Sequence, residues 1–168
     1  MIENLYSLAF QMIVFFIISI IINLFVNWRV KKVSQITNDT TNAQLILKVG
    51  LFLSLALVIS EIGGVVSPLK NSLAISASSE DYYFDFIKYL SLFAMIGLVL
   101  IFINYFISLL LFNVISGGKN LFIEICSDNW IVSVLYVSIF VSMALLIKSE
   151  MVAILDYLIP YPAMRGFN

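Results

Sequence analysis

The sequence is poor in the residues that most catalytic and metal sites require. Its 168 residues include no histidine and one cysteine, and only 11% are charged. A zinc site with histidine ligands, an internal disulfide and a Ser-His or Cys-His nucleophile pair are therefore excluded within this chain. We predict no catalytic residue, no metal site and no cofactor, and we expect that the protein is not an enzyme.

A surplus of positive charge is also missing. Nine basic residues oppose ten acidic residues, and the formal net charge is −1. Proteins that bind nucleic acids carry a basic surface, which this composition does not supply. We predict no nucleic-acid partner.

Hydrophobic residues are abundant instead, at 62% of the chain. Soluble domains contain about 45–50% apolar residues and about 25% charged residues. A helix that crosses a bilayer core needs roughly 20 apolar residues. Such runs occur at residues 5–28, at 49–69, between Lys88 and Lys119, and between Asp128 and Lys148. The sequence therefore predicts an all-α, polytopic protein with four transmembrane helices, whose first partner is the lipid bilayer.

The connections between these runs carry unequal charge. Arg29, Lys31 and Lys32 follow the first run, whereas the second connection holds more acidic than basic residues. The positive-inside rule places the first connection in the cytoplasm. With an even number of helices, both termini are then expected outside the cytoplasm. From Ser149 to Pro160 the chain offers about a dozen residues, too few for a fifth crossing, and we expect residues 149–168 to lie at the interface as a separate tail.

Two segments of the chain resemble each other. Residues 54–61 read SLALVISE and residues 142–150 read SMALLIKSE, and Asn42 and Asn129 precede the second and fourth apolar runs. This pattern predicts two tandem helical hairpins, at about 5–69 and 86–148, related as a parallel repeat. Chance similarity between segments rich in Leu, Ile, Val and Ser is the alternative.

A duplicated hairpin with asparagine at the start of the second and fourth helices resembles a bacterial inner-membrane family. It is the family catalogued as domain of unknown function number three hundred and fifty. The matching places are Thr41-Asn42-Ala43 and Asp128-Asn129-Trp130. That family is rich in Ala and Gly along these helices, whereas this chain has Leu, Val and Phe there. The resemblance implies a fold and a place in the bacterial inner membrane, and it implies no catalytic residue.

Glu61 is the one charged residue inside the second apolar run. A charged group deep in a bilayer costs roughly 2.5–3.5 kcal/mol, so it normally faces protein or water. Glu61 is therefore our first candidate for a permeation path, together with Asn104 on the third run. The alternatives are a structural ion pair with Lys88 and a position close to the outer headgroups.

Small residues recur at helical spacing along the apolar runs. Such patterns allow helices to approach closely, and serines at the same spacing can instead line a water path. We expect helix packing at Gly50, Ser54, Ser60, Gly63, Gly64, Gly97, Ser138 and Ser142.

Two functions from different classes fit these observations. The first is a homo-oligomeric pore or small transporter for ions or small solutes, with the path formed between subunits. The second is a non-catalytic scaffold, or one subunit of a larger membrane complex.

Overall fold

The computed structural model describes residues 2–34, 41–76 and 82–161. All regular structure in this part of the chain is helical: α1 (Ile2–Ser34), α2 (Asn42–Ser76), α3 (Tyr82–Ile115), α4 (Leu121–Cys126) and α5 (Trp130–Tyr157). Four of them, α1, α2, α3 and α5, are long and apolar enough to cross a membrane. The prediction of an all-α chain with four such helices is confirmed, and the chain has the architecture of a multi-pass membrane protein.

The helices extend beyond the apolar runs that predicted them. α2 begins at Asn42 and not at Val49, because the Thr41 hydroxyl accepts a hydrogen bond from the Gln44 amide and caps its first turn. It also continues through Pro68 to Ser76. The charged residues that bound an apolar run mark only the apolar part of a helix, whereas hydrogen bonding decides where the helix begins and ends.

The separate tail expected after residue 148 is not observed as far as the structure describes it. α5 continues without a break to Tyr157. Met151, Leu155 and Ile159 are buried, and they pack in the cluster that also contains Leu69 of α2 and Phe93 of α3. These buried side chains make the segment part of the helical bundle. Residues 162–168 of the expected tail lie outside the described part.

A short helix, α4, occupies the connection between α3 and α5. Gly117 and Gly118 have φ values of 68° and 82°, which glycine adopts without strain, and they turn the chain out of α3. The Asn120 side chain then accepts hydrogen bonds from the first amides of α4. Phe122 and Ile125 of α4 pack in a buried cluster with Val26 of α1. The sequence analysis did not predict this helix.

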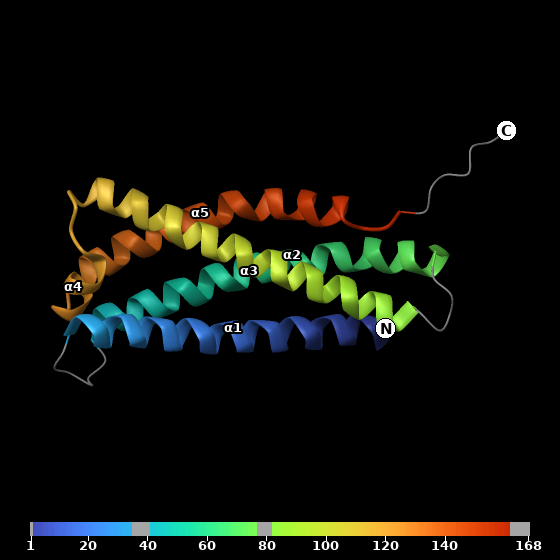
Figure 1. Cartoon of the computed structure of the whole chain (residues 1–168), viewed down its shortest axis with the longest axis horizontal. Helices are drawn as coiled ribbons and strands as arrows, with labels where there is room; N and C mark the ends of the chain where they lie inside the picture. Colours follow the sequence, from blue (N-terminus) through green and yellow to red (C-terminus); the bar gives the residue numbers. More distant parts are fainter. Residues whose placement is uncertain (1, 35–40, 77–81, 162–168) are drawn as a thin grey trace.

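α2 and α5 form the centre of the bundle and run parallel (Figure 1). At the α4 end, the Ala43 amide donates to Asp128 Oδ1; further along, Gly50 faces Val137, and Ser72 donates to the Pro160 carbonyl. α3 crosses both central helices on one side, and α1 packs on α2. The contacting residues are 85 to 88 positions apart, close to the spacing of the two similar segments. The tandem repeat itself stays a prediction.

Candidate functional site

Glu61 forms an ion pair in the bundle. Its Oε1 lies 2.8 Å from Nζ of Lys148, and the side chains are 17% and 38% exposed. The pair joins α2 to α5 because these helices run parallel in a nearly constant register. Because Glu61 is partly exposed and paired with Lys148, its negative charge is compensated at the surface of the bundle.

The cation beside Glu61 differs from the one that the sequence suggested. Lys88 is exposed on α3, whereas Lys148 lies on the helix that packs most extensively against α2. The charge order along the chain placed Lys88 on the same side of the membrane, but it carried no information on which helix adjoins α2. Lys148 is the ion-pair partner of Glu61 that the sequence analysis missed.

The distance of Glu61 from the α4 end also changes. Glu61 is nineteen residues from Asn42, or about 28 Å along α2, whereas it is twelve residues, or about 18 Å, from Val49, where the apolar run of the sequence begins. This is close to the thickness of a hydrocarbon core, about 30 Å. If the α4 end lies at one boundary of the hydrocarbon core, the Glu61–Lys148 pair therefore lies near the opposite boundary.

Asn104 lies apart from this ion pair. It is 1% exposed, and its Nδ2 donates to the Phe140 carbonyl of α5 at 3.2 Å. Ser108 donates to Asn104 Oδ1, also at 3.2 Å. Phe140 and Lys148 are eight residues apart, about 12 Å along α5. Asn104 thus fastens α3 to α5, and it does not share a path with Glu61 inside the subunit.

Four of the small residues lie at contacts between helices. A Cβ placed on Gly50 would lie 2.4 Å from both methyl carbons of Val137, so α2 and α5 touch there. Ser54 is buried one turn further and donates to the Gly50 carbonyl. Gly63 faces Gln11 of α1, and Gly97 faces Met151 of α5.

The other small residues are on the outside of the bundle. Gly64 has nothing within 4 Å of an added Cβ. Ser60, Ser138 and Ser142 are exposed, and the hydroxyls of Ser60 and Ser138 donate to carbonyls of their own helices. None of these four is buried at a contact between the described helices.

These exposed residues gather on one face of the molecule. On α2, Gly50 and Glu61 face α5, and the stripe of Ser60, Gly64 and Ser67 lies around the helix from them. On α5, Val137 and Lys148 face α2, and the stripe of Ser138, Ser142 and Ser149 lies around the helix from them. Because the helices are parallel, both stripes lie on the same side of the pair, opposite α3. We call this surface the serine face, and its members are Ser60, Gly64, Ser67, Ser138, Ser142 and Ser149. The Glu61–Lys148 pair stands between its two stripes.

A second polar cluster is built at the α4 end, where the two segments that carry the family resemblance meet. The Ala43 amide donates to Asp128 Oδ1 at 2.9 Å, and the Thr41 hydroxyl donates to the Ile125 carbonyl at 3.1 Å. Asn129 Nδ2 donates to Glu124 Oε2 at 2.6 Å. These polar groups satisfy each other, so the cluster fixes the ends of α2, α4 and α5.

Cys126 belongs to the same region. Its Sγ lies 3.9 Å from the Val30 carbonyl oxygen, and burial raises the pKa of the thiol. A thiol of raised pKa stays protonated at neutral pH and reacts slowly. Among the described residues no group of three or more Cys, Asp or Glu could hold a metal ion.

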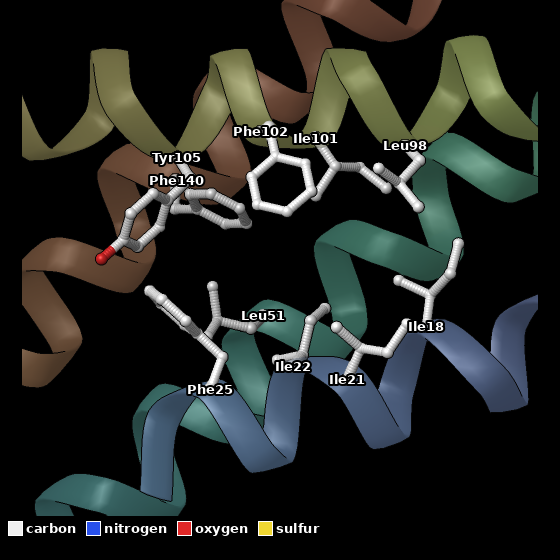
Figure 2. Close-up of a pocket in the computed structure, with 10 residues that line it drawn as sticks. All are labelled: Ile18, Ile21, Ile22, Phe25, Leu51, Leu98, Ile101, Phe102, Tyr105 and Phe140. Carbon is white, nitrogen blue, oxygen red and sulfur yellow. The ribbon is translucent and has the colours of Figure 1, made fainter. Parts of the chain in front are cut away.

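An apolar cavity of about 100 Å³ lies between α1 and α3 (Figure 2). Leu51 of α2 and Phe140 of α5 form its floor, and the remaining side chains that line it come from α1 and α3. Tyr105 carries the one hydroxyl among the lining residues. Composition alone did not predict this cavity, because its walls differ in no way from the other lipid-facing residues of α1 and α3.

Comparisons with known proteins return no relative for this chain. No family model, no curated protein and no solved structure matches it. The arguments on function therefore rest on the residues and their geometry.

Proposed function

We propose that this chain is a homo-oligomeric membrane protein, a pore or small transporter for ions or small solutes. The path forms where the serine faces of neighbouring subunits meet. The observation that carries this proposal is the serine face itself, an exposed stripe of hydroxyls and glycine on two adjacent helices with an ion pair between them.

The chemistry of this face favours a neighbouring subunit over lipid. Small residues let helices from two subunits approach closely, and their hydroxyls can bond across the contact or to water. Glu61 and Lys148 offer one negative and one positive group to a passing solute or ion. Lipid chains would add no partner to these hydroxyls, which donate within their own helices, or to the ion pair, whereas a second subunit could.

The interior of a single subunit supports a path less well. Asn104 is enclosed by hydrogen bonds to Phe140 and Ser108, and the cavity between α1 and α3 has a hydrocarbon lining. A polar solute would find no continuous set of partners among these side chains. A path between subunits avoids this barrier.

The proposed address is the bacterial inner membrane, with both termini outside the cytoplasm. The family resemblance supports the membrane, and the basic residues at the end of α1 support the orientation. These residues, Arg29, Lys31 and Lys32, stand at the α4 end of the bundle.

Flux measurements in proteoliposomes test this function. We expect ion or proton flux from the wild-type protein, and we expect Glu61→Gln to lower it about tenfold or to flatten its dependence on pH between 5 and 8. The substitution removes a charge with little change in shape. Glu150→Gln, at an exposed position two residues beyond Lys148, is the matched control and should keep wild-type flux. Equal flux in wild type and Glu61→Gln would remove Glu61 from the path.

A non-catalytic scaffold, or a subunit of a larger complex, is the second candidate. The exposed serine face favours it, because such a face can also hold the helix of an unlike protein. Gentle purification from native membranes separates the two candidates. A stoichiometric unlike partner, together with absent flux from the folded wild-type protein, would establish the scaffold in place of the pore.

A further inference from the structure

The cavity between α1 and α3 opens sideways. Ile21 on α1 and Phe102 on α3 are about half exposed, at 47% and 50%, while Ile18 at the inner wall is 7% exposed. Figure 2 shows the two helices facing each other across the space, with α2 and α5 behind it. Between Ile18 and Phe25 the α1 wall is seven residues long, about 10 Å of helix axis. The cavity is therefore a short groove that faces the surrounding bilayer.

The size and lining of the groove limit what can occupy it. An α-helix with its side chains is about 10–12 Å in diameter, so it is too large for a cavity of about 100 Å³. Water is a poor occupant, since buried waters need about three hydrogen bonds and the walls are hydrocarbon. A single extended alkyl chain fits both the shape and the chemistry.

One end of the groove meets a cluster of positive charge. The Tyr105 hydroxyl points toward the α4 end (Figure 2), where the guanidinium of Arg29 lies beside it. Arg29 also stacks over Phe122 of α4, with Cζ 4.9 Å from the ring centre, and its buried Nε has no hydrogen-bond partner. Lys32 and Arg29 both approach the Trp28 ring, at 5.5 and 6.0 Å.

In the described part of this end, the carboxylates of Glu124 and Asp128 have other partners. Glu124 accepts from Asn129 and lies 3.8 Å from Lys119, and Asp128 accepts from the Ala43 amide. Neither of these two carboxylates forms an ion pair with Arg29 or Lys32. Tryptophan itself is typical of the headgroup level of a membrane.

From this juxtaposition we propose that the groove binds an anionic phospholipid. One acyl chain occupies the space between α1 and α3, and the phosphate lies against Arg29, with Lys32 adding charge. Basic pockets between transmembrane helices are a recognised way of holding anionic headgroups. A zwitterionic lipid brings its own ammonium group to the same cluster, so it is bound less well. This proposal does not depend on the pore function.

Photolabelling of the full-length protein in nanodiscs tests the position of the chain. The probes are a phosphatidylglycerol and a phosphatidylcholine, each with a diazirine midway along one acyl chain. We expect phosphatidylglycerol to label residues 18–25 and 98–105 in preference to the exposed Leu92 and Leu110 of α3, which do not line the groove. Even labelling of all exposed segments would overturn the proposal.

Variants test the headgroup site and the groove separately, beginning with the headgroup site. Arg29→Gln should reduce the preference for phosphatidylglycerol about fivefold, the expected effect of one basic residue near the surface. Lys31→Gln, exposed at the same helix end, should keep most of the preference. An equal loss of the phosphatidylglycerol preference in both variants would show that the preference comes from general surface charge. That result would overturn the headgroup site.

Filling the groove should lower the labelling of both lipids. Ile22→Trp places a larger ring in the space, and Ile101→Phe is the milder change if the first variant does not fold. Leu24→Trp is the matched control, because Leu24 is exposed on α1 and does not line the groove. Unchanged labelling in a folded Ile101→Phe variant would show that the chain does not lie there.

Discussion

At the residue scale, the closest contact between the central helices depends on one missing methyl group. The methyl carbons of Val137 fill the space in which any other residue at position 50 would place its Cβ. Such contacts are common between membrane helices, where packing has to supply stability that the hydrophobic effect does not. Gly64, fourteen residues further along α2, faces open space. The two glycines look alike in the sequence but differ in their surroundings.

This difference gives a prediction. Gly50→Ala should lower the free energy of unfolding by about 1–3 kcal/mol, because α2 and α5 have to separate or Val137 has to move. In the isolated subunit Gly64→Ala should be neutral or stabilising, since alanine is the better helix former by about 1 kcal/mol. Unfolding in mixed detergent, followed by circular dichroism, measures both.

A second substitution provides the control for the contact. Val137→Ala in the Gly50→Ala background removes the methyl groups that clash. The double variant should then lose less stability than the sum of the single variants. Strict additivity of the two single effects would show that the contact is not formed.

Glu61 could be recognised from the sequence, and its partner could not. A lone carboxylate in an apolar run is conspicuous in any membrane protein. Lys148 is 87 positions away, at the end of a different apolar run, and only the packing of α5 on α2 brings its ammonium to 2.8 Å. Asn104 was the other residue predicted for the path, and the structure gives it a contact between α3 and α5 instead.

At the element scale, the beginning of α2 depends on a distant turn. The first amides of a helix have no partner within the helix. Here the Ala43 amide donates to Asp128 in the turn that links α4 to α5. Asp128 itself has a φ of 55°, a left-handed conformation that Asp and Asn adopt more readily than other residues with side chains. The turn and the helix start therefore stabilise each other.

Removing this cap should be measurable. Asp128→Ala should cost about 1–2 kcal/mol, because it removes the acceptor and places alanine at a positive φ. Asp128→Asn keeps an oxygen acceptor and tolerates the conformation, so its loss should be smaller. Thermal unfolding in detergent is the measurement, with the exposed Ser127→Ala as control. A loss in Ser127→Ala equal to that in Asp128→Ala would argue against a specific cap.

The lengths of the elements show where sequence patterns are insufficient. Apolar runs located all four long helices, because a span must be apolar over its whole length. They missed α4, which has six residues, and they placed the ends of α2 and α5 too early. Short helices and helix ends are set by caps and tertiary contacts, such as those of Asn120 and Met151, and not by hydropathy.

At the scale of the whole molecule, two surfaces remain open in the described chain. The serine face lies on the side of α2 and α5 opposite α3, and the apolar groove lies between α1 and α3. The serine face consists of small residues, most of them polar. The groove is lined by apolar side chains and ends beside basic residues. We propose that the first meets another subunit and that the second holds lipid, so the two substitution series should act independently.

Cross-linking tests the subunit contact directly. In a Cys126→Ser background, Ser142→Cys on the serine face should form dimers with a short bis-maleimide in native-like membranes. Met95→Cys is the control, because Met95 is 68% exposed on α3, away from that face. Comparable dimer yields at both positions would indicate random collision, and the homo-oligomer proposed through this face would be abandoned.

The sequence by itself determined the class of this protein. The excess of apolar residues and the four long apolar runs define a chain of membrane-crossing helices, because length and hydropathy are local properties that each segment carries alone. The tertiary structure decided what those helices present to each other. The pairing of Glu61 with Lys148, the cap from Asp128 and the groove beside Arg29 each join residues of different elements, and such distances depend on how whole helices pack.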